Sequence, residues 1–184
     1  MPQRDWKTLL DTAPKFGFKA NLVRCISKNV FDGRQPPSYL FTSGRPGRCN
    51  PKGVFCLYMS EDRATALTEY DKYYSEPQPH IAFYGKLVTK AIIDLADSTT
   101  QAHFGFVPTV YFDSFRLKTH PTTLQRLGLE ISRQSTVAGI RFPSAACHVA
   151  GTVGHNVVVY KNAFLSPNSL QILGAEETVL EEWP

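Results

Sequence analysis

The sequence lacks the short patterns that usually identify a nucleotide-binding or metal-binding framework. Its four cysteines include no C-x-x-C pair, so a zinc ribbon or zinc finger is not indicated. It has no G-x-G-x-x-G turn and no G-x-x-x-x-G-K-[ST] loop, which argues against a doubly wound dinucleotide fold and a P-loop fold. We therefore expect free thiols and no bound metal, and any nucleotide chemistry must rest on other residues.

Long apolar runs are also missing. Stretches such as 156–160 (NVVVY) are far too short to cross a bilayer. The opening stretch, MPQRDWKTLLDTAPKF, lacks the uninterrupted apolar core of a signal peptide. These two absences lead us to expect a cytoplasmic protein without a membrane partner.

The composition is that of an ordinary globular protein. The chain has 184 residues, of which 42% are hydrophobic and 20% are charged, which is enough for one domain with a sizeable core. We therefore treat residues 1–184 as a single domain. The net charge of +4 permits an anionic partner, but the basic residues are dispersed, and we expect no direct contact with nucleic acid.

The hydrophobic pattern predicts a mixed, strand-rich α+β domain, because helices do not alternate with every strand. Residues 27–53 read as a long polar loop, and loops of that length are usually functional or mobile. Residues 96–120 show no clear pattern. Strands are expected at 21–26, 54–59, 80–87, 91–95, 137–142 and 156–160, with a further candidate at 170–173.

Three helices are predicted from their start and stop signals. A short helix covers residues 5–13 before a proline. A second covers 60–74, with Ser60 as its cap and two acidic residues in its first turn. A third covers 121–127, and Gly128 supplies its expected stop.

One loop combines rigidity with positive charge. Residues 43–53 (SGRPGRCNPKG) contain three glycines, two prolines, two arginines and a lysine. Glycine lets a backbone approach a ligand closely, proline stiffens the loop, and the planar guanidinium group suits phosphate oxygens. The loop is therefore a candidate cradle for pyrophosphate, and the alternative is a solvent-exposed turn whose charges keep the protein soluble.

Two further stretches place polar groups where side chains often border a cleft. Glu69 lies on or beside an aromatic stripe that Tyr70 and Tyr73 form on the predicted helix, so its carboxylate either reaches water or lines a pocket. Ser144 follows the end of the predicted strand at 137–142, without the G-x-S-x-G elbow of a hydrolase. The alternative for Ser144 is a turn or helix cap.

Together these stretches resemble the RES-domain family, which is named for an arginine, a glutamate and a serine. The likeness extends over about residues 21–164, and two cysteines depart from the family pattern: Cys25 stands where a bulkier side chain is common, and Cys49 where an aromatic one is frequent. The matching residues are Gly47-Arg48-x-Asn50-Pro51-x-Gly53, Leu57-Tyr58-x-Ser60, Ala66-Leu67-x-Glu69 and Gly139-Ile140-Arg141-x-Pro143-Ser144-Ala145.

The resemblance implies an ADP-ribosyltransferase-like fold and an enzyme that acts on NAD. RES domains are toxins of bacterial toxin–antitoxin pairs, and characterised members cleave the nicotinamide–ribose bond of NAD. The expected activity is therefore that of an NAD glycohydrolase or NAD phosphorylase, with NAD as substrate and no further cofactor. The expected protein partner is an antitoxin with a helix-turn-helix domain that covers the active-site cleft.

The resemblance also assigns roles to individual residues. Arg48, Glu69 and Ser144 match the catalytic positions of the family. Arg48, with Arg24, suits the pyrophosphate, and Glu69 suits the positive charge that develops at the anomeric carbon. The expected NAD-binding residues are Arg24, Arg48, Asn50, Tyr58 and Ser144.

Several alternatives stay open on the sequence. The acceptor of ADP-ribose is water, phosphate or a specific protein, and the last of these would make the chain an ADP-ribosyltransferase. A non-catalytic nucleotide-binding module is a second alternative, and a nucleic-acid binder is the weakest. The tail at 174–184 (GAEETVLEEWP) docks either on the chain's own surface or on a partner.

Overall fold

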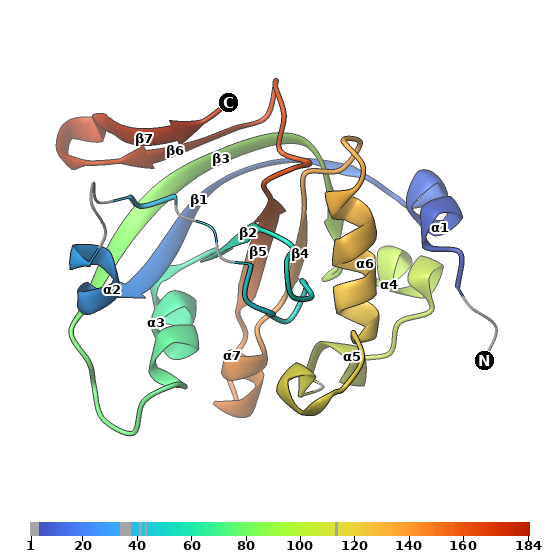
Figure 1. Cartoon of the computed structure of the whole chain (residues 1–184), viewed down its shortest axis with the longest axis horizontal. Coiled ribbons are helices and arrows are strands. Elements are labelled where there is room, and N and C mark those ends of the chain that lie inside the picture. Colours follow the sequence, from blue (N-terminus) through green and yellow to red (C-terminus); the bar gives the residue numbers. More distant parts are fainter. Residues whose placement is uncertain (1–3, 34–37, 41, 43, 113) are drawn as a thin grey trace.

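The computed structural model describes residues 4–33, 38–40, 42, 44–112 and 114–184, which form a mixed α+β fold around a curved sheet (Figure 1). The strand-rich α+β class predicted from the sequence is therefore confirmed. The strands in this part of the chain are β1 (Phe16–Ser27), β2 (Cys56–Ser60), β3 (His80–Asp94), β4 (Gly139–Pro143), β5 (His155–Tyr160), β6 (Ser169–Leu173) and β7 (Val179–Trp183).

The strand order determines where the sheet closes and where it has an edge. Over the described residues the order is β1-β2-β5-β4-β3-β6-β7, and β1 also pairs with β3. Strands β1, β2, β5, β4 and β3 therefore form a closed circle of pairings. The antiparallel pair β6–β7 extends this circle beside β3 and leaves β7 at the edge.

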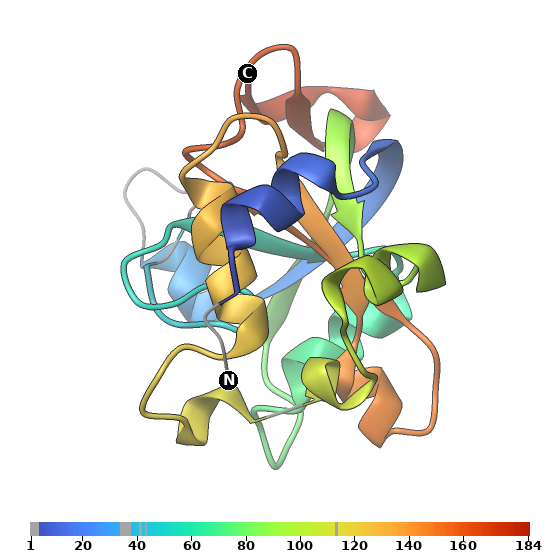
Figure 2. The ribbon, with the colours of Figure 1, turned by 90° about the vertical axis from the view of Figure 1, so that its right-hand side faces the viewer.

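The helices lie mostly around the closed part of the sheet (Figures 1 and 2). Helices α1, α4, α5 and α6 gather at one end, and α2 and α3 lie toward the other. They are α1 (Trp6–Thr12), α2 (Lys28–Asp32), α3 (Arg63–Asp71), α4 (Ser98–Phe104), α5 (Thr109–Phe112), α6 (Thr123–Ser132) and α7 (Ala145–Val149), with short 3₁₀ turns η1 (Phe115–Leu117) and η2 (Ala175–Glu177).

The buried side chains form two clusters, because alternate residues of a strand point to opposite faces of the sheet. In β5, Val158 and Tyr160 pack into the first cluster together with Leu127 of α6. Val157 and Val159 of the same strand pack into the second cluster with side chains of β1, β3 and β6. The apolar run that the sequence shows at 156–160 is thus a central strand buried on both faces.

One long strand replaces two of the predicted ones. The strands expected at 80–87 and 91–95 are both parts of β3, which has 15 residues. It pairs antiparallel with β1 from His80 onward, and its end pairs parallel with β4, where Ile92 lies opposite Gly139. The two predicted strands are one, because exposed Val88 and Lys90 alternate with buried Thr89 and the ladder with β1 continues.

The second helix starts later than predicted. Ser60 is the last residue of β2 rather than a helix cap. The cap of α3 is Asp62, whose carboxylate accepts a hydrogen bond from the backbone N–H of Thr65 at 2.8 Å. Ser60 instead donates its hydroxyl hydrogen to Oδ1 of Asn156 at 2.7 Å, so a residue assigned to a helix end belongs to a polar contact inside the sheet.

Gly128 does not stop the third helix, and α6 continues to Ser132. The glycine is required by close packing. A Cβ atom at position 128 would lie 1.8 Å from the carbonyl oxygen of Cys49 and 2.2 Å from the hydroxyl of Tyr160. Because Tyr160 donates to that same carbonyl at 2.7 Å, the missing side chain lets α6 approach the loop that carries Cys49.

The stretches without a clear sequence pattern contain short helices. Residues 96–120 contain α4, α5 and η1, and the polar loop 27–53 begins with α2.

The tail at 174–184 docks on the chain itself, because β7 pairs with β6 and the ring of Trp183 lies 5.7 Å from that of Phe164. Within the described ranges, no helix combines the length and the apolar character needed to cross a membrane.

Candidate active site

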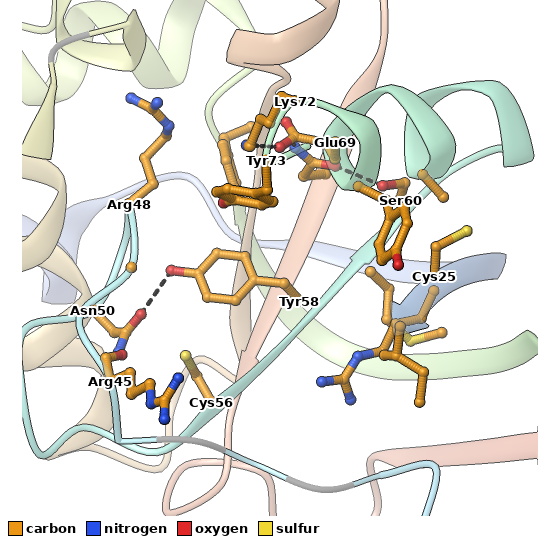
Figure 3. Close-up of a pocket in the computed structure, with 18 of the residues that line it drawn as sticks. Cys25, Arg45, Arg48, Asn50, Cys56, Tyr58, Ser60, Glu69, Lys72 and Tyr73 are labelled. Atoms are coloured by element: carbon orange, nitrogen blue, oxygen red, sulfur yellow. Dashed lines mark hydrogen bonds and ion pairs between the residues drawn. The ribbon is translucent and has the colours of Figure 1, made fainter. Parts of the chain in front are cut away.

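A cavity of about 350 Å³ lies between the loop at 45–50, strands β1 and β2, and helix α3 (Figure 3). Its wall mixes charged, polar and aromatic side chains drawn from segments far apart in the sequence. The lining residues that matter most for its chemistry are Arg24, Arg48, Asn50, Tyr58, Glu69 and Asn156.

Glu69 of α3 is held by three side chains from different elements. Its Oε1 atom accepts hydrogen bonds from the hydroxyl of Ser144 at 2.6 Å and from Nδ2 of Asn156 at 2.7 Å. Its Oε2 atom forms an ion pair with Lys72, one turn further along (Figure 3). The side chain of Glu69 is 20% exposed, so the carboxylate reaches the cavity from a mostly buried position.

The charge state of Glu69 follows from two opposing effects. Burial raises the pKa of the carboxyl group, because it disfavours the ionised form. The charge of Lys72 and the hydrogen bonds from Lys72, Ser144 and Asn156 lower it, and together they bring the pKa below its ordinary value. Glu69 is therefore an ionised acceptor at neutral pH, with a fixed orientation.

The strands place the two donors to Glu69. Asn156 begins the buried run of β5 and lies opposite both Ser60 of β2 and Phe142 of β4. Since the Ser60 hydroxyl occupies Oδ1 of Asn156, the amide turns its Nδ2 toward Glu69. Ser144 follows β4 as the cap of α7, and its oxygen accepts from the N–H of Cys147 at 3.1 Å while its hydrogen goes to Glu69.

The opposite wall is a loop without regular structure, held by a buried asparagine. Nδ2 of Asn50 donates to the carbonyl oxygens of Arg45 at 2.8 Å and Val54 at 3.0 Å. Its Oδ1 accepts from the hydroxyl of Tyr58 at 2.8 Å, and that hydroxyl accepts from the N–H of Cys49 at 2.8 Å (Figure 3). The polar atoms of Asn50 and Tyr58 are thus used within the protein, and Tyr58 offers its ring to the cavity.

Helix α6 holds this loop in place through the side chain of Gln125. Nε2 of Gln125 donates to the carbonyl oxygens of Gly47 at 2.8 Å and Asn50 at 3.3 Å. Gly47 itself has no room for a side chain, because a Cβ atom there would lie 2.5 Å from Oδ1 of Asn50 and 2.9 Å from the Tyr58 hydroxyl. The glycine in this loop is therefore needed for contact with the protein's own side chains.

Arg48 and Arg24 bring positive charge to the cavity from two sides. Nη1 of Arg48 donates to the carbonyl oxygen of Tyr111 at 2.5 Å, and its guanidinium group lies 5.6 Å from the centre of the Phe115 ring. Nη1 of Arg24, on β1, donates to the carbonyl oxygen of Tyr39 at 3.0 Å. Each guanidinium group is thus held by a backbone oxygen outside the loop 44–53.

A second cavity of about 650 Å³ adjoins the first and has Arg48 in common with it. Tyr73 belongs to both, and its ring lies 4.9 Å from the ammonium of Lys72 and 4.7 Å from the guanidinium of Arg116. Phe115 is a further shared residue. The boundary between the two cavities is therefore cationic and aromatic, which suits an anionic ligand with a planar ring.

The cysteines that border the site are not activated. Burial raises the pKa of Cys56 to about 12 and that of Cys49 further still. Cys25 lines the cavity half-buried, and burial also raises its pKa. These thiols stay protonated at neutral pH and are poor nucleophiles. Among the described residues, no group of three or more histidine, cysteine, aspartate or glutamate side chains could hold a metal ion.

The structure brings most of the predicted site residues to one cavity. Ser144 is 2% exposed and caps α7, as its alternative interpretation predicted, and it is linked to the cavity through its hydrogen bond to Glu69. The loop 44–53 contributes to a cavity wall and is not a detached turn. The predicted residues that line the cavity are Arg24, Arg48, Asn50, Tyr58 and Glu69.

Three polar residues of the site were missed from the sequence. Asn156 was assigned only to a strand, although an asparagine next to a buried valine run was a usable signal. Ser60 was assigned to a helix cap. Lys72 follows Glu69 at the i+3 spacing that allows an ion pair, but such pairs are common on solvated helices.

Comparison with known proteins identifies the family of this chain. The model of the RES domain matches residues 22–175, and the chain therefore belongs to the RES-domain family. No curated protein sequence matches the chain.

A solved structure shows the same fold. A chain in the crystal structure of the M. tuberculosis MbcT–MbcA toxin–antitoxin complex superposes with a TM-score of 0.68. The superposition covers 98% of this chain and 92% of that chain at 12% sequence identity. At such low identity the likeness establishes the architecture, and the chemistry must be argued from the residues of the site.

Proposed function

We propose that this protein consumes NAD by cleaving the bond between nicotinamide and ribose. The observation that carries this proposal is the ionised carboxylate of Glu69, fixed by Ser144 and Asn156 in a cavity that also contains Arg24 and Arg48. A dinucleotide needs cationic groups for its pyrophosphate and a carboxylate for its reacting sugar, and this cavity contains both. Membership of the RES-domain family supports the same assignment.

The chemistry asks little of the protein beyond electrostatics. Nicotinamide in NAD is cationic and leaves as a neutral molecule when the bond from its ring nitrogen to C1′ of ribose breaks. The ribose then carries oxocarbenium character, and the Glu69 carboxylate stabilises that positive charge or accepts a hydrogen bond from a ribose hydroxyl. An acceptor oxygen adds to C1′ and loses its proton, which completes the transfer.

The remaining residues bind and position. Arg48 and Arg24 suit the pyrophosphate, because guanidinium groups pair with phosphate oxygens in a planar, bidentate way. The Tyr58 ring borders the nicotinamide or ribose. Ser144 and Asn156 act through Glu69, since their hydrogen bonds end on its Oε1 atom.

The cellular role we propose is that of a toxin held inactive by an antitoxin. The structural relative comes from a toxin–antitoxin complex. The two adjoining cavities and their cationic side chains open at the surface, where a protein could cover them. An antitoxin with a helix-turn-helix domain is the partner we propose, with its protein-binding part seated over the cavity.

The direct test is release of nicotinamide from NAD by the purified protein, measured by chromatography with and without inorganic phosphate. Release in both conditions, with ADP-ribose as product, identifies a glycohydrolase. Release that depends on phosphate identifies a phosphorylase, and mass added to a protein identifies an ADP-ribosyltransferase. Binding of NAD without any release of nicotinamide would contradict the proposal and favour a non-catalytic nucleotide-binding module.

A further inference from the structure

The C-terminal strand carries a carboxylate on the face of the sheet that is buried. In β7, Glu181 lies opposite Ile172 and Trp183 lies opposite Leu170, and both β6 partners are fully buried. Glu181 and Trp183 therefore point to the core side, while the intervening Glu182 points to solvent. A half-buried carboxylate in such a place needs hydrogen-bond donors.

Three donors from a short distant segment meet this need. Oε1 of Glu181 accepts from the hydroxyl of Ser38 at 2.9 Å. Its Oε2 atom accepts from the backbone N–H groups of Tyr39 at 2.6 Å and Leu40 at 3.2 Å. Hydrogen bonds to an ionised carboxylate are among the stronger ones in proteins, so Glu181 fixes the backbone of residues 38–40.

The segment fixed by Glu181 is the one that holds an arginine of the candidate active site. The carbonyl oxygen of Tyr39 accepts the hydrogen bond from Nη1 of Arg24 at 3.0 Å, and Arg24 lines the cavity that contains Glu69. The Tyr39 ring packs 5.0 Å from Phe31 and 5.1 Å from Phe83, measured between ring centres. The packing of the Tyr39 ring anchors residues 38–40 against the protein, and Glu181 orients their peptide groups through its hydrogen bonds.

The geometry points to Glu181 as a positioning residue that orients Arg24 for the anionic part of the substrate, through the backbone of residues 38–40. This inference rests on the proposed function for the identity of the substrate. It concerns a residue of β7, which lies beyond the stretch 22–175 that matches the RES domain, and it assigns this strand a part in the site. A purely structural role for Glu181 would stabilise β7 without changing substrate affinity.

The test compares Glu181→Gln with Glu182→Gln, its neighbour on the exposed side of the same strand. Glutamine has the same shape, but its amide cannot accept from three donors. Glu181→Gln should weaken the binding of ADP-ribose, measured by calorimetry, by roughly tenfold, the scale of a lost charge-assisted hydrogen bond. It should raise the KM for NAD by the same factor and leave kcat within about twofold. Glu182→Gln should match the parent protein in each measurement.

A double-mutant cycle then tests whether Glu181 acts through Arg24. Arg24→Ala should weaken ADP-ribose binding, and adding Glu181→Gln to it should cause little further loss, because the group being oriented is gone. Full additivity, or an unchanged affinity in Glu181→Gln alone, would overturn the inference. So would a parent protein that does not bind ADP-ribose.

Failure of the proposed function would look different. A parent protein that binds ADP-ribose but releases no nicotinamide from NAD contradicts the enzymatic proposal, and the calorimetric cycle still decides the role of Glu181. Amide hydrogen exchange provides a control for folding: Glu181→Gln should speed exchange at Tyr39 and Leu40 and leave the buried amides of β5 at the parent rate.

Discussion

The two walls of the cavity hold their side chains in position by different means. The wall with Glu69 is built on regular elements, since α3, β5 and the cap of α7 each contribute a side chain whose backbone position is already fixed. The wall with Arg48 is a loop, and its shape depends on Asn50, Tyr58 and Gln125, whose polar atoms replace the missing backbone ladder. The same cavity therefore has one wall ordered by secondary structure and one ordered by side chains.

Because of this difference, substitutions on one wall should affect mainly catalysis and substitutions on the other mainly the stability of the fold. On the helix wall, a change to the carboxylate removes a reacting charge while α3 retains its backbone hydrogen bonds and its Asp62 cap. On the loop wall, a change to one supporting side chain leaves buried polar groups without partners and disturbs the loop itself. Substitutions on the two walls should therefore fail in different assays.

The largest effect is expected from Glu69→Gln on the helix wall. The substitution keeps the shape but removes the negative charge, so kcat for nicotinamide release should fall by roughly 100-fold or more. The melting temperature should stay close to that of the parent. Glu76→Gln, an exposed residue outside the cavity, is the matched control and should retain full activity. Parent-like turnover by Glu69→Gln would show that this carboxylate is not the reacting group.

Arg48→Ala on the loop wall should act on binding rather than on the bond-breaking step. Loss of a guanidinium group that pairs with phosphate oxygens should raise the KM for NAD on the order of tenfold to a hundredfold. Arg133→Ala provides the control, since its side chain is 63% exposed at the end of α6. An unchanged KM in Arg48→Ala would mean that another cation holds the pyrophosphate.

Tyr58→Phe tests the support of the loop. The variant keeps the ring that faces the cavity but removes the hydroxyl shared by Asn50 and Cys49, so the free energy of unfolding should fall by about 1–3 kcal/mol. Denaturant titration measures this, with Tyr84→Phe as a control because Tyr84 is 51% exposed. Equal destabilisation by the two variants would argue against the loop network.

The smallest effect is a displaced pH profile in Lys72→Met. Burial raises the pKa of Glu69, and Lys72 contributes the largest opposing influence, so its removal should raise that pKa. A carboxyl group with a lowered pKa stays ionised as the pH falls until that pKa is reached. The acid limb of kcat/KM should therefore move to higher pH in Lys72→Met and return toward the parent position in Lys72→Arg.

A titration of the Glu69 carboxyl carbon by NMR gives the same information without turnover. An acid limb and a carboxyl titration that both stay in place in Lys72→Met would show that the ion pair does not control this group.

The sequence was sufficient for features that depend on local pattern. The α+β class followed from short apolar runs, and the strand at 156–160 lies where its valines predict it. The predicted extents of β3 and α6 were both wrong for the same reason. Residues 88–90 and Gly128 suggested a break in the chain's regular structure, but neighbours from distant segments accommodate them, and no local pattern shows those neighbours.

The family motifs identified more of the candidate site residues than composition alone did. The resemblance to the family named Arg48, Glu69 and Ser144 together, yet it could not show that Ser144 donates a hydrogen bond to the Glu69 carboxylate across 75 positions of the chain. Asn156 and Lys72 were missed because an asparagine in a strand and a lysine one turn from a glutamate are both ordinary features of a sequence.

The amino-acid order by itself determined the α+β class and most of the strands, and it marked the rigid basic loop, the helix glutamate and the serine after a strand. Only the tertiary structure decided which of their polar atoms face the cavity and which are used within the protein. The physical reason is that a buried polar group must find a partner, and for Glu69 and Glu181 the partners come from segments far away in the sequence.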